Sequence, residues 1–596
     1  MSEHATAAPR QERPGNDAGR LRWRRPAGRG LAAAGSGLWL TLAFAPVEWS
    51  LVAWVGLVPI LFLGLRRRAH PFLLGVVFGA AHFVTSLYWL YPVFLAAPVG
   101  MALYCLLFPA VWLWACRALW QGLCYAPAED VLPAAALPPA RPTRVGEFLF
   151  AVGCAALWVA TEWCRSWLLT GFPWNLIAVS QWEHIRLLRL TRFTGIYGLS
   201  FLIVLVNAGF FLFLHALRQR QVRPRRLRDV MPYPLATVVA LVVLACWIPP
   251  APWPQTDRAV RVAVVQGGLE QMRVPSEAQL QRAIDVYSRL TLEVVEREQP
   301  DLVVWPETAL PMYMTDEHGQ AGRLLRQILA RTRTPMMLGT IEERPQPAPP
   351  ADAADAVPAS ASFNSLVLFD GGGQRLEHFD KIHIVPFGEY LPLKELWPGP
   401  FRRWYRRVMA RDLTPGREHT VIAFKGLRFA PAICYEDVFP EISRGGVLKG
   451  ANALITITND AWYAETAGAH QHMTHAVFRA AETCRPMLRA GNNACSCLIM
   501  PDGRIVGQLK DPRTGSPFYS GYHVYAVPVA DDPPVTFYTR YGNVFAWFAL
   551  ALSATALLYC LYRFLVRKRW LHTRTMPPAA PAGDARDDAV ADSDAG

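Results

Sequence analysis

Three side chains suited to nucleophilic catalysis follow predicted buried strands in the second half of the chain. Glu307 comes directly after the apolar run 302–306, Cys434 ends the run 429–434, and Lys381 follows a further predicted strand end. A cysteine attacks as the thiolate, and a neighbouring base and cation both favour that form. Because strand ends can meet at one edge of an α/β sheet, the three can form one site. Taken singly, each also has a structural reading, as a strand thiol, a turn carboxylate or a surface ammonium.

Short apolar, β-branched runs alternate with amphipathic stretches in this half of the chain. Such alternation predicts an α/β domain in which helices cover the sheets. The predicted strands are 260–266, 302–306, 335–340, 365–369, 429–434, 453–458 and 497–500, and the predicted helices lie near 277–298, 319–333, 438–449 and 469–485.

The first half of the chain and its carboxyl end contain long uncharged apolar blocks. Hydrophobic residues make up 52% of the 596 and charged residues only 18%, a balance that excludes a disordered chain and argues against a purely soluble one. A bilayer core about 30 Å thick needs about 20 apolar helical residues. We expect about eight membrane helices, the first two short enough to form a tight hairpin, near 31–47, 50–65, 72–94, 98–116, 148–170, 195–217, 231–249 and 542–563.

Basic residues set the expected orientation of these helices. The chain has 60 Lys+Arg against 47 Asp+Glu, a formal net charge of +13, and its arginines gather before the first span and at 66–68, 218–228 and 567–569. With eight spans, all these clusters fall on one side, which is the positive-inside pattern. This distribution favours a membrane protein over a partner of nucleic acid. Both termini are therefore expected in the cytoplasm and the segment 250–541 on the outside.

The charge and hydropathy patterns divide the chain into five parts. These are a cytoplasmic Arg-rich segment 1–30, a membrane domain 31–249 with helices one to seven, an extracytoplasmic soluble domain 250–541, a last membrane helix 542–563 and a disordered cytoplasmic tail 564–596.

Motifs in a fixed order along the chain resemble the nitrilase (carbon-nitrogen hydrolase) superfamily. Combined with eight spans, they resemble the apolipoprotein N-acyltransferase family over essentially the whole chain. The motifs are G-F-P-W-N at 171–175, W-P-E at 305–307, D-K-x-H-x-V-P-F-G-E at 380–389, I-C-Y-E-D at 433–437 and N-D-A-W-Y at 459–463.

The resemblance implies an αββα sandwich with Glu307, Lys381 and Cys434 as a catalytic triad. Cys434 would be the nucleophile, Glu307 the general base and Lys381 the cation that stabilises the oxyanion. Supporting roles would fall to the backbone N–H of Tyr435, to Glu389 as a second carboxylate, and to Glu436, for which a structural role in the turn is an equal alternative.

The reaction that the resemblance implies is acyl transfer in two steps through a thioacyl-cysteine. The donor would be the sn-1 ester of a membrane phospholipid, and the acceptor the α-amine of the diacylglyceryl-cysteine at an apolipoprotein N-terminus. The site would face the periplasm from the bacterial inner membrane. No cofactor and no obligate protein partner are expected. No metal is expected either, because no carboxylate or cysteine lies at ligand spacing beside His470, His472 and His475.

Four further residues are candidates for substrate contact. Arg186, Arg189 and Arg192 fall on the predicted outer side, against the positive-inside rule. Their spacing predicts one helix face, with apolar residues between them toward the bilayer. The helix would either let its arginines snorkel or gather phospholipid phosphates. Through the resemblance, Trp462 is the fourth candidate.

Two departures and two rival functions stay open at this stage. Val274 and Ala494 depart from the family pattern, which puts the lipid pocket in doubt but not the chemistry.

One rival function is that of a membrane-tethered nitrilase-type amidase, which the soluble domain alone does not exclude. The other is a transporter or sensor with a catalytically dead domain. The near absence of charges in the spans and the complete Glu/Lys/Cys set argue against the second rival.

Overall fold

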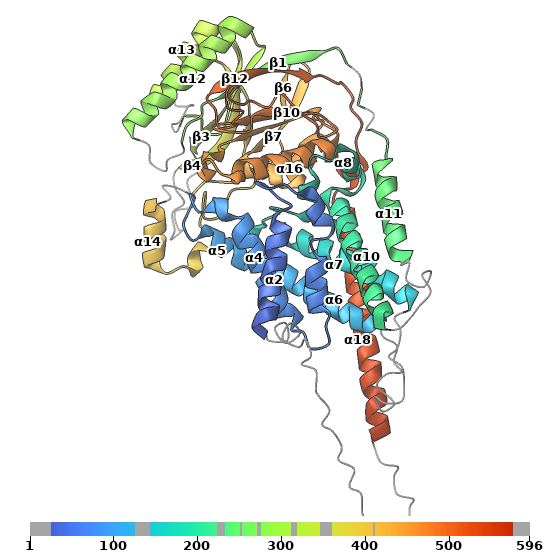
Figure 1. The fold of residues 1–596 in the computed structure, drawn as a ribbon. Coiled ribbons are helices and arrows are strands. Elements are labelled where there is room, and N and C mark those ends of the chain that lie inside the picture. The colour runs from blue at the N-terminus through green and yellow to red at the C-terminus, as the bar shows by residue number, and fades with distance from the viewer. Residues whose placement is uncertain are drawn as a thin grey trace, which may run out of the picture.

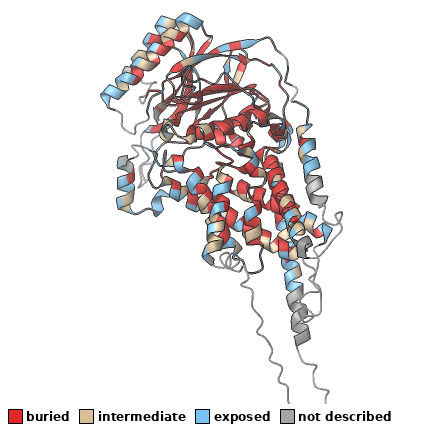
Figure 2. Ribbon diagram, viewed as in Figure 1, coloured by how far each residue is buried: buried red, intermediate tan, exposed pale blue. Residues whose placement is uncertain are grey.

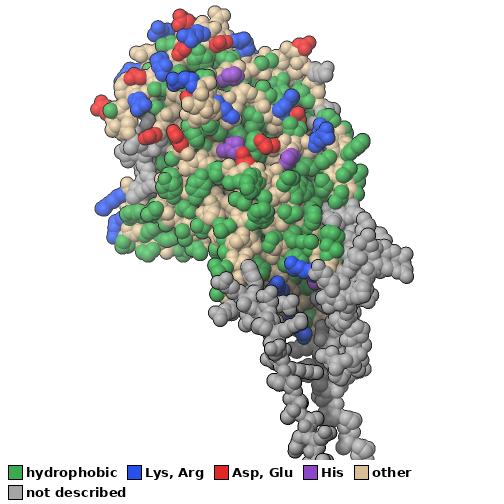
Figure 3. Space-filling view, viewed as in Figure 1, with side chains coloured by type: hydrophobic (Ala, Val, Ile, Leu, Met, Phe, Trp, Pro, Cys, Tyr) green, Lys and Arg blue, Asp and Glu red, His purple; other side chains and the backbone are tan. Residues whose placement is uncertain are grey.

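The computed structural model describes residues 26–124, 143–222, 233–250, 253–254, 256–270, 276–310, 319–345, 360–408 and 412–575. Most of the predicted N-terminal segment, the end of the predicted tail and Val274 lie outside these residues. A bundle of apolar helices lies below a domain of two sheets and their covering helices (Figure 1). Hydrophobic side chains cover much of the visible face of the bundle, whereas Lys, Arg, Asp and Glu gather over the upper domain (Figure 3).

Helices occupy all eight segments that were predicted to span a membrane. Within the described part of the chain, four are long and apolar enough to cross one, at 97–124, 144–165, 196–219 and 544–566. The last helix continues to Thr575, beyond its predicted end at 563. The bundle contains α2 (Pro26–Thr41), α3 (Val58–Gly64), α4 (Pro71–Ser86), α5 (Ala97–Cys105), α6 (Leu107–Cys124), α7 (Arg144–Arg165), α10 (Ile196–Val222), α11 (Tyr233–Cys246) and α18 (Val544–Thr575).

The remaining elements outside the bundle and the two sheets are mostly short helical turns. They are η2 (Ser50–Trp54), η3 (Tyr88–Leu90), η5 (Leu168–Thr170), η6 (Ile177–Gln181), α8 (Ile185–Leu188), α9 (Thr191–Thr194), η8 (Lys394–Leu396), α14 (Gly399–Val408), η9 (Cys434–Val438), η10 (Asp460–Tyr463) and α17 (Phe537–Tyr541).

The upper domain contains two six-stranded sheets, with strand orders β12-β1-β2-β3-β4-β5 and β11-β10-β9-β8-β7-β6. In each sheet the central strands are parallel, β1 to β3 in the first and β7 to β9 in the second. The strands are β1 (Ala259–Gln266), β2 (Leu302–Trp305), β3 (Met336–Pro345), β4 (Ser360–Phe369), β5 (Arg375–Asp380), β6 (Ile422–Phe424), β7 (Leu427–Ile433), β8 (Ala453–Thr458), β9 (Met487–Gly491), β10 (Cys497–Ile499), β11 (Ile505–Val506) and β12 (Gly521–Pro528).

The two sheets pack face to face as the inner layers of a four-layer sandwich. Val262 and Leu302 of the first sheet share one core with Phe429 and Ile455 of the second. The alternate residues of the first sheet face α12 (Glu277–Glu298) and α13 (Gln320–Thr332). The second sheet is covered by α15 (Pro440–Leu448) and α16 (Ala467–Thr483). The predicted α/β domain with helix-covered sheets is therefore confirmed.

Helix α16 joins this sandwich to the membrane bundle. It is buried along almost its whole length (Figure 2), because the second sheet covers one side and the bundle the other. Its Gln471 accepts hydrogen bonds from the indoles of Trp89 (2.9 Å) and Trp174 (2.8 Å) and donates to the carbonyl of Ala45 (2.9 Å). The buried amide thus fixes how the bundle meets the sandwich.

Candidate active site

The three residues of the predicted triad come together between the two sheets. Glu307 follows β2, Lys381 follows β5, and Cys434 follows β7. The first two strands belong to one sheet and the third to the other. The site therefore lies between the facing sheets, and not at one edge of a single sheet as the strand ends alone had predicted. The three side chains are almost completely buried.

The Lys381 ammonium lies between two carboxylates. Its Nζ is 2.8 Å from Oε1 of Glu389 and 3.6 Å from Oε1 of Glu307. Burial by itself would lower the pKa of Lys381, but these two carboxylates outweigh it and raise the pKa above its ordinary value. The site therefore holds a permanent cation at neutral pH.

Hydrogen bonds from one asparagine side chain and two backbone N–H groups fix the carboxylates around this cation. Asn364 of β4 donates from Nδ2 to Oε1 of Glu307 (2.8 Å) and to Oε1 of Glu389 (3.2 Å). The backbone N–H of Asn459 donates to Oε2 of Glu307 (3.0 Å), and that of Val385 donates to Oε2 of Glu389 (2.6 Å). Both oxygens of each carboxylate are thereby held in place, as a positioned base requires.

Cys434 occupies the sharp turn between β7 and η9. Its φ of +54° lies in the left-handed region, which non-glycine residues adopt at a cost when the surrounding structure enforces it. Burial raises the pKa of the Cys434 thiol well above its ordinary value, and the Glu307 carboxylate adds to the increase while Lys381 opposes it. The resting Cys434 side chain is therefore a neutral thiol, which would need a base to act as a nucleophile.

Glu436 and Tyr435 hold the turn at Cys434 from two sides. Glu436 accepts the backbone N–H groups of Ile382 (2.7 Å), His383 (2.9 Å) and Ile433 (2.8 Å), which ties the Lys381 loop to the turn. Burial raises the pKa of Glu436 to about 7, against these hydrogen bonds. The Tyr435 ring stacks on aromatic side chains of the segment that follows α7. These contacts favour the structural role for Glu436 over a role in chemistry.

A buried cluster of four charged side chains lies directly behind Cys434. His472 of α16 lies 2.7 Å from Asp460 and 2.8 Å from Asp437, and Arg489 of β9 forms ion pairs with both aspartates. Nε2 of His472 is also 3.2 Å from the Cys434 carbonyl oxygen. Two cations balance two anions only if the imidazole is protonated. The cluster braces the strained turn in that state.

The stability of the protein should fall between pH 6.5 and 9 because of His472. Burial would lower the pKa of His472, but Asp437 and Asp460 raise it to about 9 from an ordinary 6.5. The folded state therefore binds this proton more tightly than the unfolded state. The resulting stabilisation, on the order of 3 kcal/mol, is complete below pH 6.5 and disappears as the pH rises through 9.

The thermal unfolding midpoint of the detergent-solubilised protein, measured across this pH range, checks the prediction. His472→Gln should lower the midpoint at pH 6.5 and flatten its dependence on pH. His523→Gln is the control, because exposed His523 of β12 lies outside the cluster and burial lowers its pKa, so this variant should keep the slope of the parent above pH 6.5. An equal slope in His472→Gln and the parent would contradict the assignment.

The G-F-P-W-N segment at 171–175 reaches from the bundle to the turn at Cys434. Trp174 stacks on the rings of Tyr435 (6.3 Å) and His472 (5.4 Å), and the Tyr435 hydroxyl donates to the Gly171 carbonyl (3.3 Å). Arg165 of α7 supports the segment from below by donating to the carbonyls of Phe172 (3.0 Å) and Trp174 (2.7 Å).

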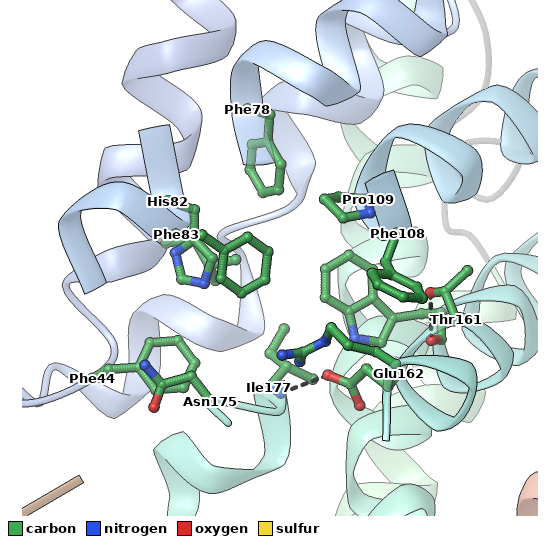
Figure 4. Close-up of a pocket in the computed structure, with 13 residues that line it drawn as sticks. Phe44, Phe78, His82, Phe83, Phe108, Pro109, Thr161, Glu162, Asn175 and Ile177 are labelled. Carbon is green, nitrogen blue, oxygen red and sulfur yellow. Dashed lines mark hydrogen bonds between the residues drawn. The ribbon is translucent and has the colours of Figure 1, made fainter. Parts of the chain in front are cut away.

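A small cavity of about 20 Å³ lies inside the bundle beneath this segment (Figure 4). Phe83, His82 and Asn175 surround it, together with Glu162, whose Oε1 accepts the N–H of Ile177 (2.7 Å). Glu162 and the neighbouring Arg165 thus hold the loop that contacts the turn at Cys434. The cavity itself does not reach Cys434.

The structure does not bring the three candidate arginines to the triad. The predicted single helix through Arg186, Arg189 and Arg192 is wrong, because the chain forms the separate four-residue turns α8 and α9. Leu188 between them is buried in the protein and does not face the bilayer. Arg189 donates to the Ile248 carbonyl (3.0 Å). Their role in phospholipid binding stays a prediction.

The remaining predicted contacts are placed as follows. Trp462 is partly exposed in η10, whereas its neighbour Tyr463 packs against Trp89 (4.4 Å). Ala494 is buried. Among the described residues, His470, His472 and His475 form no metal-binding group. His475 is instead buried against Trp174.

Three residues of the site were missed in the sequence, namely Asn364, Arg489 and Gln471. Asn364 and Arg489 are polar residues in otherwise apolar strands, and Gln471 lies in a helix that faces the core. A polar residue in such a position usually has a buried partner, and this was the available signal. The partners themselves come from distant parts of the chain and cannot be read from spacing.

Two family models together match most of the chain. The model for the apolipoprotein N-acyltransferase N-terminal domain matches residues 36–209, and that for carbon-nitrogen hydrolase matches 261–515. Among solved structures, an amidase from Nesterenkonia sp. is similar at 16% identity and a TM-score of 0.33, covering 49% of this chain and 95% of its own.

Curated relatives match almost the whole chain. An apolipoprotein N-acyltransferase of Geobacter metallireducens is 30% identical over 532 residues, which cover 88% of this chain and 94% of that protein. One of Rhizobium etli is 30% identical over 504 residues, covering 82% and 89%. As its motifs predicted, the chain belongs to the apolipoprotein N-acyltransferase family.

Proposed function

We propose that the chain transfers the sn-1 acyl group of a membrane phospholipid to the α-amine of the diacylglyceryl-cysteine at an apolipoprotein N-terminus. Its family makes it an acyltransferase that N-acylates lipoproteins. The donor position, the lipid on the acceptor and the covalent intermediate are the finer parts of the proposal. The observation that carries them is a neutral, buried thiol beside a fixed carboxylate and a permanently charged ammonium.

In the first step the Cys434 sulfur attacks the carbonyl carbon of the ester. The thiol proton passes to Glu307, which Asn364 and the Asn459 N–H hold in place. The negative charge that develops on the carbonyl oxygen is stabilised by Lys381 and by the backbone N–H of Tyr435. The carbon–oxygen bond then breaks, Glu307 returns the proton to the departing alcohol, and a thioester and a lysophospholipid result.

In the second step the free α-amine of the acceptor attacks the thioester carbon. Glu307 takes a proton from the amine, the carbon–sulfur bond breaks, and the proton goes to the leaving thiolate of Cys434. Glu389 keeps Lys381 in place through both steps by its 2.8 Å contact. The products are an amide on the lipoprotein and the resting thiol.

We propose further that the chain crosses the bacterial inner membrane eight times, with the domain 250–541 in the periplasm. The domain 31–249 would supply the first seven helices and 542–563 the last, with 1–30 and 564–596 in the cytoplasm. The basic clusters at 66–68 and 218–228 support this orientation. Both substrates are lipid-anchored, and a site joined to the bundle through α16 and the loop 171–175 suits such substrates.

Intact-mass measurement tests the covalent step. Incubation with a phospholipid carrying one labelled acyl chain should add one acyl mass to the protein, at Cys434 after peptide mapping. A diacylglyceryl-cysteine peptide should then remove the label as an amide. Release of the label as free fatty acid with no peptide amide would indicate a hydrolase, and an adduct at another residue would overturn the assignment of the nucleophile.

A further inference from the structure

We propose that the end of the helical bundle far from the sandwich binds an anionic phospholipid. The binding groove has a volume of about 380 Å³ and lies between α2, α3 and α10. Arg29, Arg66 and Arg218 provide its charged part, and Phe62, Leu63 and Leu214 belong to its apolar wall. We call these six residues the arginine groove. This site is separate from the catalytic machinery.

The helices that form the arginine groove fix its depth in the membrane. The chain leaves α2 toward the sandwich, where Glu48 forms an ion pair with His470 of α16 (2.8 Å). Helix α10 also begins at the sandwich, where the Ile196 N–H donates to Glu482 (2.9 Å). Arg218 lies about 33 Å further along α10, at 1.5 Å per residue. Since the bilayer core is about 30 Å thick, the arginines lie at the headgroups of the opposite leaflet.

Only some of the polar atoms in the charged part of the groove have hydrogen-bond partners among the described residues. Arg29 donates from Nη1 to the Arg68 carbonyl (2.9 Å), while its Nε is buried and has no hydrogen-bond partner in the described part of the chain. The Arg218 guanidinium lies 4.1 Å from the centre of the Phe62 ring. No acidic side chain is among the described residues that line the groove. Within the described part of the chain, no acidic side chain therefore balances the charge of the groove.

The combination of charge and apolar wall selects the occupant. Guanidinium groups bind the two oxygens of a phosphodiester in a fork, and the wall beside them fits an acyl chain. A free phosphate would leave that wall unused. A zwitterionic headgroup would bring a cation to a site that has three already. An anionic phospholipid such as phosphatidylglycerol satisfies both parts.

The positive-inside rule alone explains basic residues in this loop, but not their arrangement around a groove. Arg67 and Arg68 are equally exposed and adjacent in sequence, yet they do not line it. They provide a matched control, because R66Q/R218Q and R67Q/R68Q remove the same charge from the same side of the bundle. Both pairs are exposed, so neither substitution should prevent folding.

Native mass spectrometry of the full-length protein in detergent tests the proposal, with ether-linked phosphatidylglycerol as the probe. An ether lipid has no ester for Cys434 to attack, so the result is independent of the proposed acyl transfer. R66Q/R218Q should weaken retention of this lipid at least about tenfold, whereas R67Q/R68Q should stay near the parent. Ala32→Phe, which narrows the groove without changing charge, should also weaken it.

Three results would overturn the proposal. The first is an equal loss of affinity in R67Q/R68Q, which would indicate unspecific attraction by charge. The second is equal retention of ether-linked phosphatidylcholine by the parent. The third is displacement of the lipid by glycerophosphoglycerol, which has no chains, at concentrations similar to those of the lipid, because the apolar wall would then contribute nothing.

Discussion

Replacement of Cys434 by alanine should abolish acyl transfer while the protein still folds and inserts. Removal of a covalent nucleophile typically costs at least about 10⁴-fold in turnover. Cys434→Ser should fail as well, because a buried hydroxyl is a far weaker nucleophile than a thiol at neutral pH. The measurement is the rate at which a labelled acyl chain appears on a diacylglyceryl-cysteine peptide in detergent, together with the intact mass of each variant.

Cys495→Ala is the matched control for this prediction. Cys495 is also a buried thiol, and its φ of +60° is close to the +54° of Cys434. Both substitutions therefore remove the same atoms from a left-handed backbone position, but only one lies beside Glu307 and Lys381. Substantial transfer by Cys434→Ala, or an equal loss in Cys495→Ala, would remove Cys434 from its role as nucleophile.

The positions of the three triad residues along the chain were predictable because each follows a strand. The runs before Glu307 and Cys434 are apolar and β-branched, and they form β2 and β7 as predicted. The bounds of the strand before Lys381 were not predicted. This strand, β5, lies at a sheet edge, and most of its side chains are not buried. An edge strand lacks the apolar pattern from which strands are recognised.

What the sequence did not predict depends on contacts between distant segments. Asn364 joins Glu307 to Glu389, and Arg489 pairs with aspartates from two other turns. The three-residue spacing of the arginines in 186–192 predicted a single helix, but packing against other parts of the chain produces two separate turns. Leu188 is buried close to Gly503, and the chain breaks into two turns around it. The periodicity of apolar and polar residues predicts how one helix would form in isolation. Residues 186–192 instead lie where separate parts of the chain meet.

Replacement of Glu307 by glutamine should slow formation of the thioester at least about 10²-fold, the usual contribution of a general base. Burial, the largest cause of the raised pKa of Cys434, remains in this variant although the smaller contribution of the Glu307 charge is lost, so few thiolates exist at neutral pH. The variant should then react only through preformed thiolate, and its single-turnover rate should rise about tenfold per pH unit on the alkaline side. The parent, with its base in place, should show a much weaker dependence there.

The pH dependence separates lost base catalysis from simple disruption of the site. The amide introduced by Glu307→Gln does not reproduce the hydrogen bonding of the carboxylate, which accepts from both Asn364 and the Asn459 N–H, because an amide offers only one acceptor oxygen. A distorted site would be slow at every pH. Glu342→Gln is a suitable control, since Glu342 is a buried carboxylate of the same sheet that pairs with Arg344 and Arg375 outside the site. If single-turnover acylation by Glu307→Gln matches the parent at neutral pH, Glu307 is not the base, and the nearby carboxylate of Glu389 becomes the group to test.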